Sequence, residues 1–174
     1  MKTFIAILLL AVVTSVAAYA KDDVTVDVYL VTDAGIGEKI GTITVEETQY
    51  GVLFKPALAK LPPGLHGFHL HEHDKCDCAD KDGKMTAAQS AGGHYDPDSE
   101  KHHLGPYKDD GHRGDLPSLF VASDGTATVP VLAPRLKVKD LDDRALMIHA
   151  NGDNFSDQPE NGGGGPRIAC GAID

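Results

Sequence analysis

The sequence has 174 residues, of which 41% are hydrophobic and 24% charged. This composition is too rich in core-forming residues for a disordered chain, and the length favours one compact domain. The formal net charge of -10, from 26 acidic and 16 basic residues, argues against a nucleic-acid partner, because such proteins need a basic surface to neutralise phosphates. The chain has nine histidines and no tryptophan, and all nine histidines follow residue 65. This uneven distribution points to a function carried by histidine.

Residues 1–20 are typical of a secretory signal peptide. Lys2 precedes an apolar run from Phe4 to Val13, and small residues then end in Ala18-Tyr19-Ala20, an A-x-A cleavage site. The apolar run is half as long as the ~20 residues that a membrane-spanning helix needs. We therefore expect cleavage after Ala20, a single domain over residues 21–174, and no membrane association once the peptide is removed.

The remaining chain predicts short strands between turns, with hardly any sustained helical period. Alternating or β-branched runs predict eight strands, at residues 24–31, 39–46, 50–56, 66–73, 118–122, 126–132, 145–149 and 167–173. Eight antiparallel strands indicate an all-β Greek-key barrel or sandwich. Residues 74–117 and 150–166 are longer than ordinary connections, and such loops are usually functional or held in place by something.

Three cysteines bear on the first long loop: Cys76, Cys78 and Cys170. In an oxidising compartment Cys170 could close a long loop to either Cys76 or Cys78, which leaves one thiol over. A zinc site of cysteine and histidine is the alternative, although no C-x-x-C spacing occurs.

The histidines predict metal sites. On an extended strand His69 and His71 share one face, so two imidazoles can reach one metal. Three imidazoles and a carboxylate follow within the loop, the donor set of a closed structural zinc site: His94, His103, His112 and Asp115. His149 ends an apolar strand and could be the remote ligand that completes a four-imidazole copper site.

Several motifs resemble the copper/zinc superoxide dismutase family. GFHLHEH at 67–73, AGGHYDP at 91–97, HRGDLP at 112–117, the strand ending in His149, and GPRIACG at 165–171 recur in the family's order and spacing. APRL at 133–136, GDNFSDQP at 152–159 and the GGGG run at 162–165 are similar to the bacterial periplasmic branch. The resemblance covers nearly all of residues 21–174.

The resemblance implies one copper and one zinc ion per subunit. Copper would be bound by His69, His71, His94 and His149, and zinc by His94, His103, His112 and Asp115. His94 would bridge both metals, and His103 is preferred over the adjacent His102 because its distance to Pro106 matches the family's pattern. Asp153 would link His69 to His103, and Cys76 would pair with Cys170, while Cys78 departs from the family's pattern.

The implied reaction converts two superoxide anions and two protons to dioxygen and hydrogen peroxide, with copper cycling between Cu(II) and Cu(I) while its bond to His94 breaks and re-forms. Arg167 would dock the anion, and it offsets the repulsion expected of an acidic protein. Lys81 and Lys84 are further candidates for steering superoxide. We expect a structural role for His66 and assign none to His73 or His102.

The resemblance also implies a location and a set of partners. We expect a periplasmic enzyme, exported through the inner membrane, that protects the cell envelope from superoxide; bacterial relatives include both monomers and homodimers. The alternative function is a non-catalytic periplasmic protein that binds or delivers copper and zinc on the same fold. A weaker alternative is a sandwich whose metals only brace its loops. Retention of Arg167 and Asp153 with all the ligand positions favours the enzyme.

Overall fold

The computed structural model describes residues 24–174, so the expected signal peptide lies outside the described residues. Within them the fold is all-β, with eleven strands and three short 3-10 helices. The strands are β1 (Val24–Thr32), β2 (Gly35–Thr48), β3 (Gly51–Leu58), β4 (Gly64–His66), β5 (Phe68–His71), β6 (Ala79–Lys81), β7 (Lys84–Thr86), β8 (Leu119–Val121), β9 (Val131–Ala133), β10 (Arg144–His149) and β11 (Arg167–Ile173). The 3-10 helices are η1 (Gln89–Ala91), η2 (Val138–Asp140) and η3 (Glu160–Gly163). None of the helices in residues 24–174 is long and apolar enough to span a membrane.

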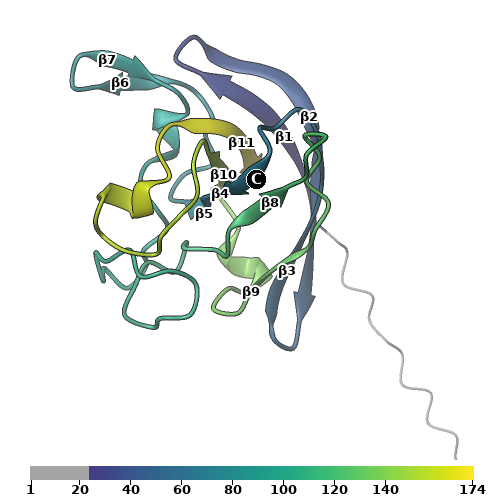
Figure 1. The fold of residues 1–174 in the computed structure, drawn as a ribbon. Helices are drawn as coiled ribbons and strands as arrows, with labels where there is room; N and C mark the ends of the chain where they lie inside the picture. Colours follow the sequence, from purple (N-terminus) through teal and green to yellow (C-terminus); the bar gives the residue numbers. More distant parts are fainter. Residues whose placement is uncertain (1–23) are drawn as a thin grey trace, which may run out of the picture.

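Seven strands form one curled antiparallel sheet in the order β5-β10-β11-β1-β2-β3-β9 (Figure 1). β4 pairs with β8 in a separate two-stranded sheet, and β6 pairs with β7 in a hairpin that projects from the body. Two pairs of neighbouring strands lie far apart in the sequence, β3 with β9 and β5 with β10, so crossover connections must join them. The expected all-β antiparallel class is confirmed.

Each of the eight predicted strands overlaps an observed strand, but most boundaries differ. The predicted strand over 66–73 is divided into β4 and β5 at Gly67, whose N–H donates to the Asn151 carbonyl instead of joining either ladder. The predicted strand over 126–132 is reduced to β9 at its end. β6 and β7 lie inside the predicted loop 74–117, where polar residues around Asp82-Gly83 gave no apolar alternation to reveal them.

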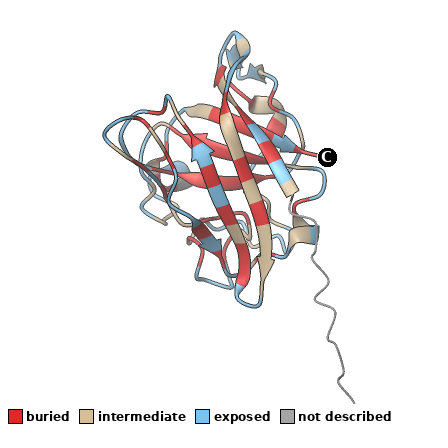
Figure 2. Ribbon diagram, turned by 90° about the vertical axis from the view of Figure 1, so that its right-hand side faces the viewer, coloured by how far each residue is buried: buried red, intermediate tan, exposed pale blue. Residues whose placement is uncertain are grey.

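The hydrophobic core lies inside the curled sheet. Along β1 and β3 buried residues alternate with more exposed ones, as side chains of period two require (Figure 2). Phe54 of β3 packs edge-to-face on Phe68 of β5, with ring centroids 5.6 Å apart, and both are fully buried. β10 lies between β5 and β11 and is buried from Ala145 to His149, which suits its nearly continuous apolar sequence.

The strand order brings the predicted site residues to one region of the sheet. β5 pairs with β10 so that His69 lies opposite Met147 and His71 opposite Ala145. On the other side of β10, His149 pairs with Arg167 of β11, at a bulge between Ile148 and His149. The remaining candidates lie on the two long loops. The first loop packs against this region through the bridges His71–His94 and His69–Asp115, and the second through the hydrogen bond from Gly67 N–H to the Asn151 carbonyl.

Candidate metal centre

Four imidazoles converge beside β5 and β10. Their nitrogens all lie within 4.8 Å of one another, and the rings are buried. The four residues are His69, His71, His94 and His149. In each ring one buried nitrogen has no hydrogen-bond partner among the described residues, namely Nδ1 of His69 and Nε2 of the other three. Buried polar atoms are nearly always satisfied, so four orphaned nitrogens facing one another fit a metal ion that accepts all four lone pairs.

The second nitrogen of each ring has a partner that fixes the ring's orientation. His71 Nδ1 donates to the Gly92 carbonyl at 3.0 Å, and His149 Nδ1 donates to the Gly165 carbonyl at 2.9 Å. His69 Nε2 donates to Asp153 at 2.7 Å, and His94 Nδ1 lies 2.9 Å from Asp115. A ring whose proton is held on one nitrogen presents the lone pair of the other, so these contacts prepare the four rings to bind a metal.

Three imidazoles and one carboxylate form a second group around Asp115. The members are His94, His103, His112 and Asp115. Asp115 Oδ1 lies 2.9 Å from Nδ1 of His94 and of His103, and 3.4 Å from Nδ1 of His112. Its other oxygen accepts the backbone N–H groups of Leu104 and Gly105 at 3.1 Å. Three nitrogens and a carboxylate oxygen around one point are the donor set of a closed zinc site, and His94 belongs to both groups.

Asp153 connects the two groups by hydrogen bonds to one ring of each. It accepts His69 Nε2 at 2.7 Å and His103 Nε2 at 2.8 Å, and its side chain is fully buried. The Phe155 N–H also donates to it at 2.7 Å. One carboxylate from the second long loop therefore orients a ring of each group.

The choice between the two adjacent histidines agrees with the structure. His103 is 1% exposed and lies in the zinc-type group, whereas the side chain of His102 is 60% exposed and donates to Asp157 at 2.9 Å. His66 is buried, with its two ring nitrogens 2.7 Å from the carbonyls of His149 and Pro62. His66 thus supports the backbone of His149, which agrees with its expected structural role.

Electrostatics keep the four-imidazole group neutral. Burial lowers the pKa of His69 and His71 well below the usual value, lowers that of His94, and lowers the pKa of His149 to about 4. Burial alone would raise the pKa of Asp115, but hydrogen bonds from His103, His112 and His94 outweigh burial and lower it. These neutral imidazoles and the ionised Asp115 are in the protonation states that bind metal. His103 differs, because burial alone would lower its pKa but hydrogen bonds to Asp115 and Asp153 outweigh burial and raise it to about 9, so zinc binding must release a proton from this ring.

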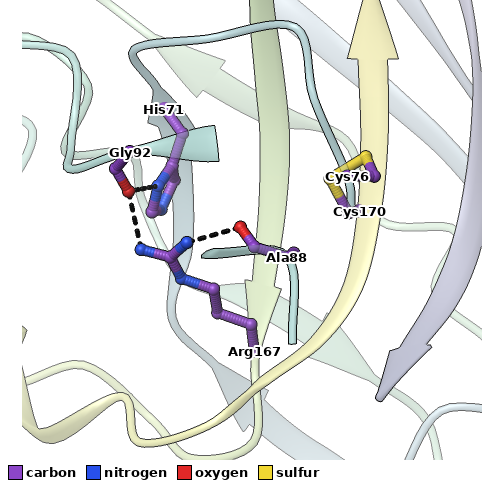
Figure 3. Close-up of a disulfide and its surroundings, with 6 residues drawn as sticks. All are labelled: His71, Cys76, Ala88, Gly92, Arg167 and Cys170. Carbon is purple, nitrogen blue, oxygen red and sulfur yellow. Dashed lines mark hydrogen bonds between the residues drawn. A yellow bond between two sulfur atoms is a disulfide. The ribbon is translucent and has the colours of Figure 1, made fainter. Parts of the chain in front are cut away.

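Arg167 lies next to the four-imidazole group and is held by two backbone carbonyls (Figure 3). Its Nη1 donates to the Ala88 carbonyl at 2.6 Å and its Nη2 donates to the Gly92 carbonyl at 2.7 Å. The Gly92 oxygen therefore accepts from both His71 and Arg167. These contacts fix a cationic guanidinium beside the group, where an anion can approach it.

The structure shows which of the two possible partners, Cys76 or Cys78, pairs with Cys170. Cys76 and Cys170 form a disulfide, while Cys78 is unpaired and partly buried. The disulfide joins the loop that carries Ala88 and Gly92 to β11, the strand that carries Arg167 (Figure 3).

A cavity of about 450 Å³ opens onto both groups. His94, His112 and Arg167 line it, together with Lys81, Lys101, Gln89, Gly92, Gly93, Glu72, Asp96 and Glu160. Lys81, one of the two lysines considered for steering, lines this cavity, whereas Lys84 projects from β7 and pairs with Asp33 at 3.3 Å. Lys101 and Glu72 also line the cavity, and no sequence motif points to them because only the folded loops bring them there.

Arg135 is a further residue that the sequence analysis did not single out. It donates to the carbonyls of Pro106, Gly111, Gly105 and His112. It thereby ties residues 105–112 of the loop that carries all four zinc-type ligands to the end of β9. Its position in APRL marked it only as part of a motif.

The fold and site define an all-β protein with two adjacent groups of candidate metal ligands that share one histidine. The family model for copper/zinc superoxide dismutase matches residues 39–173. The chain is 52% identical over 176 residues to a Cu-Zn superoxide dismutase of Escherichia coli K12, covering 99% of each, and 54% identical over 143 residues to that of Photobacterium leiognathi, covering 82% of this chain and 83% of the relative. A solved Cu/Zn superoxide dismutase from Brucella abortus superposes with a TM-score of 0.85 at 48% identity, covering 88% of this chain and all of that one.

The chain belongs to the copper/zinc superoxide dismutase family. Members of this family are oxidoreductases that use copper and zinc and act on superoxide, and the two groups of ligands described above suit those two metals.

Proposed function

We propose that this protein catalyses the disproportionation of superoxide to dioxygen and hydrogen peroxide, with copper held by His69, His71, His94 and His149 and zinc by His94, His103, His112 and Asp115. The observation that carries this proposal is the set of four orphaned imidazole nitrogens beside a guanidinium that is fixed by two carbonyls. Bound copper supplies one-electron redox chemistry, and bound zinc supplies a fixed charge and geometry.

Arg167 and His94 carry the steps that the chain itself performs. Arg167 docks the anion at the base of the cavity, since its guanidinium charge persists at any physiological pH. His94 Nδ1 contacts Asp115, so Nε2, on the side of the other three imidazoles, is the atom at which this ring can hold and release a proton. Asp153 keeps the rings of His69 and His103 in a fixed orientation during the reaction.

Superoxide decay after pulse radiolysis tests the proposal. The metal-loaded protein is expected to accelerate the decay, and His149→Ala to abolish most of that acceleration, because His149 supplies one of the four nitrogens. A tightly metal-loaded wild type that leaves the decay at its background rate would instead support the copper-delivery alternative.

We propose that residues 1–20 are a cleaved signal peptide and that the enzyme acts in the periplasm. The support is the charged start, apolar run and A-x-A site in the sequence. Protein released by osmotic shock should begin at Lys21. Recovery of a chain that begins at Met1 in the spheroplast fraction would contradict the proposal.

We propose β4 and β8 as the place where two copies would meet if the protein dimerises. Leu65 and Phe120 lie opposite each other in this two-stranded sheet and are 59% and 47% exposed. A relative from Salmonella enterica, 52% identical with a TM-score of 0.79 over 88% of this chain and all of that one, is described as monomeric. Sedimentation velocity of the wild type and of Phe120→Ser decides between the two states, and a dimer that Phe120→Ser leaves intact would contradict the placement.

A further inference from the structure

Glu72 presents an electrostatic conflict at the mouth of the cavity. It lies directly after the copper-type ligand His71, its side chain is exposed, and it lines the cavity that contains Arg167. A carboxylate at this place repels the anion that Arg167 is there to dock. The hydrogen bonds that Glu72 makes give a structural reason for a negative charge at this place.

Glu72 holds the turn whose carbonyl positions Arg167. Glu72 Oε2 accepts the Gly93 N–H at 2.8 Å, and the Glu72 N–H donates to the Gly93 carbonyl at 3.1 Å. Gly93 is thus bound to Glu72 on both sides of its α-carbon. The preceding carbonyl, that of Gly92, is the one that accepts both His71 Nδ1 and Arg167 Nη2 (Figure 3).

The glycine at position 92 fits this arrangement. Gly92 has a φ of +76°, and a Cβ there would lie 2.5 Å from Glu72 Oε2. A side chain at position 92 would therefore displace the carboxylate from the turn, besides being strained at that φ. The Glu72 carbonyl is fixed in turn by Arg144 Nη1 at 3.0 Å. The Glu72 carboxylate, the Gly92–Gly93 turn and Arg167 are therefore joined by one continuous chain of hydrogen bonds.

We propose that Glu72 is a positioning residue, which holds the Gly92–Gly93 turn so that the Gly92 carbonyl sets the place of Arg167, at the expense of some repulsion of the incoming anion. The proposal rests on the proposed function, since that function gives Arg167 its anion. The two properties of Glu72, acceptor and charge, can be separated by substitution.

Three variants separate the two properties. Glu72→Gln keeps an oxygen that can accept the Gly93 N–H and removes the charge, Glu72→Asp keeps the charge on a shorter side chain, and Glu72→Ala removes both. Glu160→Gln is the matched control, because Glu160 lines the same cavity and the described residues show no hydrogen bond from its side chain to this turn.

The first measurement is the rate at which phenylglyoxal modifies Arg167, followed by peptide mass spectrometry on metal-free and metal-loaded full-length mature protein. Glu72→Ala and Glu72→Asp are expected to speed the modification, whereas Glu72→Gln and Glu160→Gln leave it at the wild-type rate. Equal rates in all five proteins would overturn the positioning role. This readout needs no dismutase activity, so its failure is distinguishable from failure of the proposed function.

The second measurement is azide affinity of the copper-loaded protein, followed by the visible spectrum. Glu72→Gln and Glu160→Gln each remove a repelling charge and should tighten azide binding about twofold, the effect of one screened unit charge at roughly 10 Å. Glu72→Ala loses the same charge but should bind azide more weakly than wild type, because Arg167 is no longer held. If Glu72→Ala tightens binding as Glu72→Gln does, Glu72 acts through its charge alone and the proposal is wrong.

Discussion

Removing the disulfide should destabilise the metal-free protein by an amount that its position in the chain determines. Cys76 and Cys170 are separated by 94 residues in sequence. In the chain-entropy model, removing a cross-link that closes a loop of this length increases the conformational entropy of the unfolded state, which lowers the free energy of unfolding by about 4 to 5 kcal/mol. For a domain of this size each kcal/mol shifts the melting temperature by about 2 to 4 °C, so the double variant Cys76→Ser/Cys170→Ser should melt roughly 10 to 20 °C lower.

Urea denaturation and calorimetry of the metal-free protein measure this loss, because bound metals would add their own stabilisation. Cys78→Ser is the matched control, since it removes the unpaired thiol of the same loop and should change the unfolding free energy little. Arg167 modification should also speed up in the double variant, because the disulfide ties the loop of Ala88 and Gly92 to β11. A loss below about 1 kcal/mol would refute the reasoning from loop length.

Three further predictions concern the metal site and its loop. Asp153→Asn offers one amide oxygen to two ring N–H groups, so zinc and copper affinities in chelator competition should fall about 10- to 100-fold, and unchanged affinities would exclude a bridging role. Burial lowers the pKa of His149 in the folded metal-free state from 6.5 to about 4, so on acidification the unfolded chain binds this proton before the folded chain does. The free energy of unfolding should therefore fall by roughly 3 kcal/mol as the pH drops from 6.5 to 4. His149→Asn should flatten that part of the profile when unfolding by urea is measured at a series of pH values. Arg135→Ala should cost at least about 2 kcal/mol and speed proteolysis between residues 105 and 112, whereas Arg113→Ala, which breaks surface ion pairs with Asp98 and Asp140, should cost less than about 1 kcal/mol; equal losses would contradict the role given to Arg135.

The amino-acid sequence was enough to predict the fold class, and with the family resemblance it named the candidate ligands. Period-two alternation marks strands such as β1 and β3 because each must bury one face, and that requirement is local to the strand. His69 and His71 are recognisable for the same reason, since two imidazoles on one face of a strand need only that strand to meet. The loop ligands were found through motif spacing, which carries the family's pattern even where no periodicity exists.

The folded structure was needed to show which nitrogen atoms face one another in the two groups of candidate ligands, and which residues hold those rings in place. His149 approaches His69, with ring centroids 4.8 Å apart, because β10 pairs with β5. The nitrogens without partners can be recognised only because Gly92, Gly165 and Asp153 bind the other nitrogens of their rings. Glu72 and Arg135 act through backbone carbonyls and N–H groups of distant loops. Every residue except proline carries both of these backbone groups, so no residue type in the sequence reveals such a contact. Only folding brings the two partners of the contact together.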